Sequence, residues 1–288
     1  MRFITLSLIL SFILISGYSQ DKKAYQIFTS DGVAVNYFEM LDDMYDGDII
    51  FFGEHHNNPI IHWLQLELTK DLYKQKTDNL IISAEMFESD NQVIVDEYME
   101  GLISQSRFEA ECRLWPNYET DYKPLLEFAK THQLTFVASN IPRRYANAVS
   151  KGGFEALESF SKEAKSFLPP MPIAYDSTLN GYRSMMEMEG MGGHVTSNFP
   201  KAQAIKDATM AYNIDRYFKN GNQLIHYVGS GHINNFEGIV WYMYRYSPAY
   251  RIKVISVVEQ GDISKLEEES LGLADFIIAV PENMTKTY

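Results

Sequence analysis

Continuous apolar runs alternate along the chain with segments whose apolar residues recur every three to four positions. The runs are typical of buried strands and occupy residues 48–52, 80–84, 134–138, 223–228, 253–258 and 276–280. Helical spacing lies between them, at residues 59–74, 91–100, 122–131, 201–218 and about 236–244. This alternation predicts an α/β fold with a largely parallel sheet flanked by helices.

Two further regions add to this framework. Residues 25–29 and 33–37 flank the sequence Ser-Asp-Gly, which is typical of a hairpin turn. From about residue 145 to 199, glycines and prolines break the chain into short helical pieces. We therefore expect residues 20–288 to form a single domain, with a helical subdomain, or lid, at about 145–199 over the carboxyl edge of the sheet.

The first residues have the pattern of a secretory signal peptide. Arg2 precedes an almost wholly apolar run at residues 3–15, and small residues follow at 16–19. The run is too short to span a bilayer well, so cleavage after Ser19 would leave no transmembrane anchor. No cysteine lies near the cleavage position, which excludes a lipobox. The sequence thus predicts an exported protein, periplasmic or secreted.

Charge and cysteine content narrow the classes of partner. The net charge is −13, and such a surface repels phosphate backbones, so nucleic-acid binding is not expected. The single cysteine, Cys112, excludes an intrachain disulfide. Stability must come from packing, a metal, a cofactor or association.

Two short motifs of the form G-x-x-H occupy equivalent positions at strand ends. Residues 53–56 (GEHH) and 229–232 (GSGH) each follow an apolar run. Glycine permits a sharp turn there, and the crevice beyond the carboxyl ends of parallel strands is where such sheets bind ligands. His56 and His232, about 175 positions apart, are therefore expected to meet at one site.

Other functional side chains follow neighbouring strands and give the candidate catalytic set: Glu54, His56, Glu85, Arg143 and His232. Two carboxylates and two imidazoles suit a divalent metal, with His56, His232, Glu54 and Glu85 as ligands. The same groups equally suit acid–base chemistry, in which carboxylates fix the tautomer and charge of the imidazoles. Arg143 could bind a carboxylate or stabilise an oxyanion.

The remaining histidines near these motifs are less informative. His55 is expected to point away from its neighbour, and His226, within a strand, is expected to pack. His62 follows six residues after the first motif on a predicted helix, and structural and functional roles for it stay equally open.

The expected lid holds a second cluster. Residues 182–194 contain Tyr182, four of the 13 methionines and His194. Thioether and imidazole groups such as Met188 and His194 suit haem or copper(I), although methionines also fill irregular gaps between helices. The repeated methionine spacing expected of a copper site is absent from the sequence. A third group, Trp115, Tyr118 and Tyr122, either lines a flat apolar cavity or packs.

Motifs spread over about residues 48–238 resemble one family. They are residues 53–59 (GEHHNNP) with His62 and Gln65, 85–87 with Gln92, Trp115 with 122–125, 138–143, 202–203 with 207–211, and 229–232. Together they resemble the ChaN-like haem-binding family, the haem-binding uptake proteins of the Tiki superfamily, related to TraB/TIKI and erythromycin-esterase-like proteins.

The resemblance implies haem bound in or near the helical subdomain, between two protomers of a homodimer. It implies iron held by a tyrosine, with Tyr182 as first choice and Tyr175 as second, and propionates held by basic or histidine side chains. His194 and Met188 are further candidates for the haem site. In the wider superfamily, the G-x-x-H histidines and the glutamates belong to the active site of hydrolases.

These observations support two main functions, and whether the protein is an enzyme stays open. The first is an exported haem-binding protein for haem and iron uptake. The second is a metal-dependent hydrolase of peptides or esters that uses the strand-end cluster. A protein-interaction role is compatible with the composition, but no motif selects it.

Overall fold

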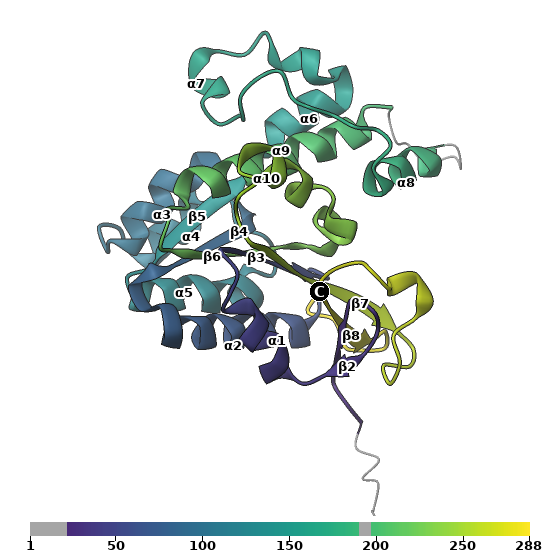
Figure 1. Ribbon diagram of the computed structural model, residues 1–288. Coiled ribbons are helices and arrows are strands. Elements are labelled where there is room, and N and C mark those ends of the chain that lie inside the picture. Colours follow the sequence, from purple (N-terminus) through teal and green to yellow (C-terminus); the bar gives the residue numbers. More distant parts are fainter. Residues whose placement is uncertain (1–21, 190–196) are drawn as a thin grey trace, which may run out of the picture.

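The computed structural model describes residues 22–189 and 197–288, and these residues form one sheet of eight strands (Figure 1). The strand order is β2-β1-β8-β7-β3-β6-β4-β5. The strands are β1 (Gln26–Thr29), β2 (Ala34–Val35), β3 (Ile49–Glu54), β4 (Leu80–Glu88), β5 (Thr135–Asn140), β6 (Gln223–Gly229), β7 (Ile252–Gln260) and β8 (Phe276–Pro281). The strands from β8 to β5 in this order are parallel to one another, and β1 pairs antiparallel with both β8 and β2.

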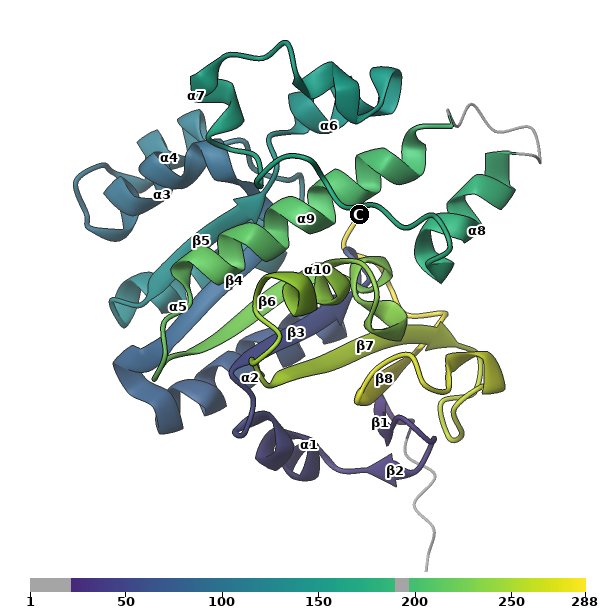
Figure 2. The ribbon, with the colours of Figure 1, turned by 45° about the horizontal axis from the view of Figure 1, so that its top comes forward.

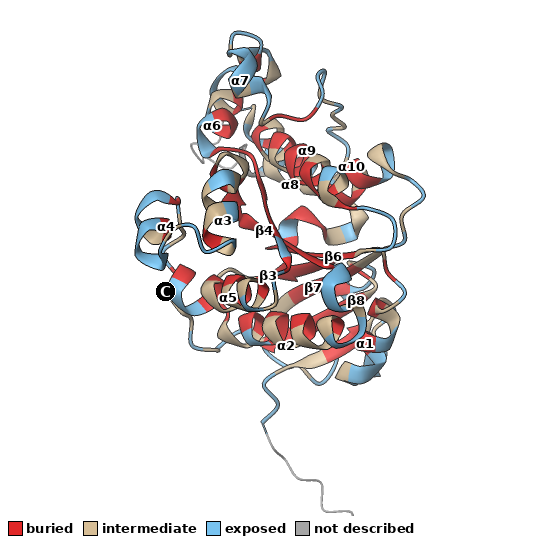
Figure 3. Ribbon diagram, turned by 90° about the vertical axis from the view of Figure 1, so that its left-hand side faces the viewer, coloured by how far each residue is buried: buried red, intermediate tan, exposed pale blue. Residues whose placement is uncertain are grey.

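Helices cover both faces of the sheet. On one face lie α2 (Pro59–Lys76) and α5 (Lys123–Thr131), and on the other lie α9 (Phe199–Tyr217) and α10 (Ile239–Tyr246) (Figure 1). Each face has its own apolar core. The strands β3, β4 and β6 are buried at every residue, because helices pack on both of their sides, and Figure 3 shows them between helices with exposed outer surfaces. The predicted α/β fold with a largely parallel sheet is confirmed.

Short helices follow β5, in the region where the sequence predicts a helical subdomain. They are α6 (Arg143–Gly152), a 3-10 turn at Phe154–Leu157, α7 (Lys162–Lys165) and α8 (Asn180–Glu189). Tyr145 and Val149 of α6 form a small core with Leu157 and with Ile205 of α9. Figure 2 shows α6 and α8 beside α9, so α9 joins this subdomain to the sheet.

The structure differs from the predicted elements at the first hairpin. The hairpin itself is present, but its second strand is only two residues long. Asn36 ends the strand because its side chain caps α1 (Tyr37–Met44), and Glu39 completes the capping box. The sequence pattern also gave no indication of α4 (Gln105–Glu111) or of the π-helical turn Tyr118–Tyr122, whereas α3 (Gln92–Met99) falls within a predicted helix.

The sequence predicts a signal peptide and no transmembrane anchor, and the structure bears on only part of this prediction. No helix in the described parts of the chain is both long enough and apolar enough to cross a bilayer. The predicted signal peptide at residues 1–19 lies outside the described residues.

Candidate functional site

The two G-x-x-H motifs lie side by side at the carboxyl ends of β3 and β6. These strands pair in parallel with Glu54 opposite Gly229, and β4 pairs with β6 on its other side. His56 Nδ1 lies 2.7 Å from Glu54 Oε1, and His232 Nε2 lies 3.3 Å from Glu85 Oε1. The sheet thus brings together the four residues that the sequence singled out.

Gly229 lies between these two histidine–carboxylate pairs. Its backbone N–H donates to Glu85 Oε2 at 2.9 Å. A Cβ atom at this position would lie 3.0 Å from His56 Nε2 and 3.6 Å from Glu85 Oε2. The absence of a side chain at the first position of the motif therefore allows the two pairs to approach each other.

Glu54 is fully buried and accepts three hydrogen bonds. Its donors are His56 and the Tyr122 hydroxyl at 2.7 Å each on Oε1, and the Gln65 amide at 2.7 Å on Oε2. Burial raises the pKa of this carboxyl, but the hydrogen bonds from His56 and Gln65 and the charge of His62 outweigh burial and lower it. Glu54 is therefore an anion that fixes the orientation of His56.

His56 is the most accessible member of the cluster. One third of its side chain is exposed (33%); its Nδ1 is bonded to Glu54, and its Nε2 has no hydrogen-bond partner in the described part of the chain. Burial lowers its pKa, but Glu54 and Glu85 together raise it above the ordinary value. The ring of Trp115 packs edge-on against the imidazole, with centroids 4.8 Å apart.

His232 is held between two buried carboxylates. Its Nδ1 contacts Asp207 Oδ1 and its Nε2 faces Glu85. Burial lowers the pKa of His232, but Glu85 and Asp207 raise it to about 10. Its positive charge in turn lowers the pKa of Glu85, although burial raises that value. His232 is an imidazolium at neutral pH, so it can donate protons but cannot act as a base.

Asp207 has a central position that the sequence analysis did not assign. It lies on α9, is buried, and also accepts a hydrogen bond from the Tyr182 hydroxyl at 2.6 Å. Gln203, one turn earlier on the same helix, contacts the His232 ring at 2.8 and 2.9 Å. The only signal in the sequence was that both residues belong to the motifs that carry the family resemblance.

His62 is a buried neighbour of the cluster and contacts it through Gln65 and the backbone of His56. Its Nδ1 lies 3.1 Å from Gln65 Oε1, and its Nε2 lies 3.0 Å from the His56 carbonyl and 3.4 Å from Asp121. It is buried and has no access to the open side. These contacts give His62 a positioning role through Gln65 and the His56 backbone.

Arg143 lies near the cluster without touching it. Its side chain is 76% exposed, and its Nε is 3.6 Å from Glu88 Oε1. It shares with His56, His232 and Trp115 a crevice of about 370 Å³, which also includes Glu85, Glu88, Asn140, Ile141, Ala146 and Lys206. The predicted set therefore divides into two histidine–carboxylate pairs, which lie on either side of Gly229, and one arginine at the mouth of the crevice.

The arrangement does not fit the predicted metal site. Within residues 22–189 and 197–288, no group of three or more His, Cys, Asp or Glu side chains is placed to hold a metal ion. His56 Nδ1 is occupied by Glu54, and both nitrogens of His232 face carboxylates. The ion pairs favour acid–base over metal chemistry at this position.

The two candidate haem ligands have different surroundings. Tyr182 is buried, and burial and Asp207 raise its pKa strongly, which opposes a tyrosinate. Tyr175 is half-buried, with its ring centroid 5.6 Å from that of Tyr182 and 5.8 Å from that of Phe154. In the described part of the chain, its hydroxyl has no hydrogen-bond partner. His194 and the Met188 side chain lie outside the described residues.

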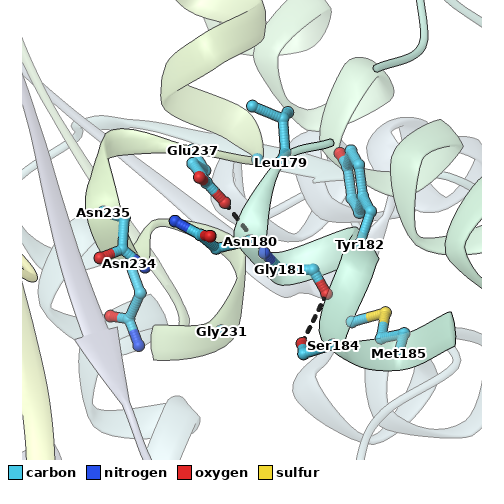
Figure 4. A pocket seen from close by; sticks show the side chains of 11 residues that line it. Leu179, Asn180, Gly181, Tyr182, Ser184, Met185, Gly231, Asn234, Asn235 and Glu237 are labelled. Atoms are coloured by element: carbon cyan, nitrogen blue, oxygen red, sulfur yellow. Dashed lines mark hydrogen bonds between the residues drawn. The ribbon is translucent and has the colours of Figure 1, made fainter. Parts of the chain in front are cut away.

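The helix that carries Tyr182 borders a cleft of about 330 Å³. Figure 4 shows α8 on one side of the cleft, with Asn234, Asn235 and Glu237 on the other. Glu237 Oε2 accepts the Gly181 backbone N–H at 2.9 Å. This contact joins α8 to the loop that carries His232, and the bond from Tyr182 to Asp207 joins α8 to α9.

Comparisons with known proteins agree with the motif resemblance. A family model described as "Haem-binding uptake, Tiki superfamily, ChaN" matches residues 40–243. No curated protein matches the chain significantly. A solved structure of Campylobacter jejuni ChaN with cofacially bound haem shares 16% identity and a TM-score of 0.63, covering 90% of this chain and 98% of that one.

Two more distant structures are similar over most of this chain, and only the first has a TM-score above 0.5. A succinoglycan biosynthesis protein has 10% identity and a TM-score of 0.52, over 85% of this chain and 90% of that one. An erythromycin esterase mutant has 12% identity and a TM-score of 0.46, over 85% of this chain and 78% of that one. At these identities the likeness concerns architecture and not activity.

Proposed function

Because the chain belongs to the ChaN family of haem-binding uptake proteins in the Tiki superfamily, we propose that it binds haem in its helical subdomain, with Tyr175 as the iron ligand. The observation that carries this assignment is the state of the two tyrosines. The Tyr182 hydroxyl donates a hydrogen bond to Asp207, whereas Tyr175 is half-buried and its hydroxyl has no hydrogen-bond partner in the described residues.

The surroundings of Tyr175 suit a flat, largely apolar cofactor. Phe154 and Tyr182 contact its ring. When bound, haem would supply ferric iron, for which tyrosinate is a known protein ligand. A second copy of the chain could cover the other side of the haem.

We expect hemin titration to separate the two tyrosines. The purified protein should give a saturable absorption change with a tyrosinate-to-iron charge-transfer band. Tyr175→Phe should abolish this band and weaken hemin binding by about tenfold or more, since one iron ligand is lost. Tyr182→Phe is the matched control and should keep the band. A band that survives in Tyr175→Phe overturns the assignment, and the absence of saturation in the parent protein overturns haem binding.

Export and uptake are part of the same proposal. The segment at residues 1–19 supports secretion to the periplasm or beyond. A tyrosinate site binds ferric haem and weakens when the iron is reduced, which suits a carrier that must release its cargo. We propose that the mature protein carries haem outside the cytoplasm as a step in iron acquisition.

A second candidate function, hydrolysis of esters or peptides, is favoured by the geometry of His56. This imidazole is oriented by a buried carboxylate on Nδ1 and is open on Nε2, which is the arrangement of a general base that activates water. The His232 imidazolium could donate a proton to the leaving group. The wider superfamily supports a hydrolase role, and the metal-dependent form has less support because the ion pairs occupy the predicted ligands.

Hydrolysis of p-nitrophenyl butyrate tests this second candidate. If His56 is the base, His56→Ala should lower the rate by about 10²-fold or more, and the rate of the parent protein should rise with pH, because the raised pKa keeps the ring protonated at low pH. His55→Ala is the control and should be nearly neutral. An unchanged rate in His56→Ala refutes this role, and loss of rate on chelation would favour the metal-dependent alternative.

A further inference from the structure

The crevice beside His56 contains a positive charge that no carboxylate in residues 22–189 and 197–288 neutralises. Lys206, on α9, lines the crevice and is half-buried. Among the residues that the structure describes, it has no hydrogen-bond or ion-pair partner. In a chain with a net charge of −13, an unpaired cation in a cavity is unusual and indicates an anionic ligand.

The two carboxylates of the same crevice, Glu85 and Glu88, already have hydrogen-bond or ion-pair partners. Glu85 is paired with His232 and the Gly229 N–H. Glu88 accepts hydrogen bonds from Arg113 Nε at 2.9 Å and from the Arg143 backbone N–H at 3.1 Å. Both acids are buried, and neither forms an ion pair with Lys206 among the residues that the structure describes.

Arg143 adds a second cation at the mouth of the crevice. Its backbone is held by Glu88, but its guanidinium reaches only 3.6 Å from that carboxylate and is largely exposed. At this distance the contact is an ion pair without a good hydrogen bond. The guanidinium forms no hydrogen bond to another residue in the described part of the chain, so its donors are available to a ligand. Arginine presents them in the planar fork that matches a carboxylate.

The wall of the crevice next to these cations is aromatic. Trp115 is fixed by edge-on contacts with His56 at 4.8 Å and Tyr122 at 6.1 Å between ring centroids. It is only partly buried, and its remaining surface lines the crevice. A rigid aromatic side chain offers a face to a planar apolar group at low entropic cost.

We propose that this crevice is a binding site, separate from the haem site, for a small organic anion whose carboxylate lies between Lys206 and Arg143 and whose planar apolar part lies against Trp115. About 370 Å³ is the size of a small-molecule site. Such a ligand would lie next to the open Nε2 of His56. The proposal goes beyond haem binding and does not depend on it.

Calorimetric titration with benzoate, in the absence of hemin, tests the proposal. Benzoate should bind saturably, and benzylamine, which has the same ring and the opposite charge, should bind at least about tenfold more weakly. Lys206→Met and Arg143→Met should each weaken benzoate binding by about tenfold, which is the effect of losing one charge-assisted hydrogen bond. Lys151→Met, an exposed cation at the far end of α6, is the control and should change nothing.

Three results would overturn the proposal: no binding of benzoate, equal binding of benzoate and benzylamine, or unchanged binding in Lys206→Met. The comparison of the two probes uses the parent protein, so it stays decisive if a variant fails to fold. Because hemin is left out, a failure of the haem proposal does not affect this result.

Discussion

Glu54→Ala is expected to destabilise the protein by about 3–5 kcal/mol, the cost typical of breaking a buried, hydrogen-bonded charge network. The carboxylate accepts from His56, Tyr122 and Gln65, and all three donors would lose their partner in the interior. Each unsatisfied buried donor costs on the order of 1–3 kcal/mol, and the deleted side chain also leaves a cavity.

Denaturant unfolding of Glu54→Ala measures this effect. The matched control is Glu67→Ala, which removes a partly exposed glutamate that pairs with Lys70 at 2.8 Å on the surface of α2. Exposed pairs contribute at most about 1 kcal/mol, so this variant should unfold almost like the parent protein. If Glu54→Ala were no more destabilising than the control, Glu54 would not organise the site in the way described.

The second large effect is a loss of stability with rising pH. His232 has a pKa of about 10 in the folded protein and about 6.5 when unfolded. The folded state therefore binds one more proton between these values. This contribution is fully present below about pH 6.5 and is lost as the pH rises toward 10. The free energy of unfolding should fall by about 1.4 kcal/mol per pH unit from this group, on the order of 3 kcal/mol between pH 7 and 9.5.

Unfolding measured across this pH range in the parent protein and in Asp207→Asn checks the cause. The asparagine keeps an acceptor for the Tyr182 hydroxyl but removes one of the two charges that raise the pKa of His232. The variant should therefore show a shallower dependence on pH. A flat profile in the parent protein, or equal slopes in the two proteins, would show that His232 is not held as a cation by these carboxylates.

The convergence of the strand-end residues could be predicted from the sequence because it follows from topology. Parallel strands end at the same edge, so Glu54 and His56 had to lie near Glu85 and His232 once the alternation of strands and helices was recognised. Gly53 and Gly229, at the first positions of the two G-x-x-H motifs, indicated where the chain turns at the ends of these strands. Short helices after β5 could also be predicted, because glycine and proline interrupt the helical pattern there.

The contacts that set the chemistry could not be predicted in the same way. Asp207 lies within a long helix, and only the packing of α9 on the sheet aims it at His232. Tyr122 looked like an aromatic packing residue, although its hydroxyl binds Glu54. The metal hypothesis was reasonable for two histidines and two glutamates, but residue types alone do not reveal that these groups pair with one another as ions.

The tyrosines illustrate the same limit. Tyr175 and Tyr182 are seven positions apart in a segment without clear periodicity. Which hydroxyl is buried against a carboxylate depends on how α8 packs on α9. The α1 helix was also not predicted, because the strand expected at residues 33–37 runs over Asn36, whose side chain caps α1 together with Glu39.

A crystal structure of the hemin-loaded protein would test the central claim, haem binding through Tyr175, most directly. We predict that the iron lies in the helical subdomain within bonding distance of the Tyr175 oxygen, while the His56 and His232 ion pairs stay as described. Iron bound by His56 in the strand-end crevice, or by Tyr182 after it has left Asp207, would contradict the account.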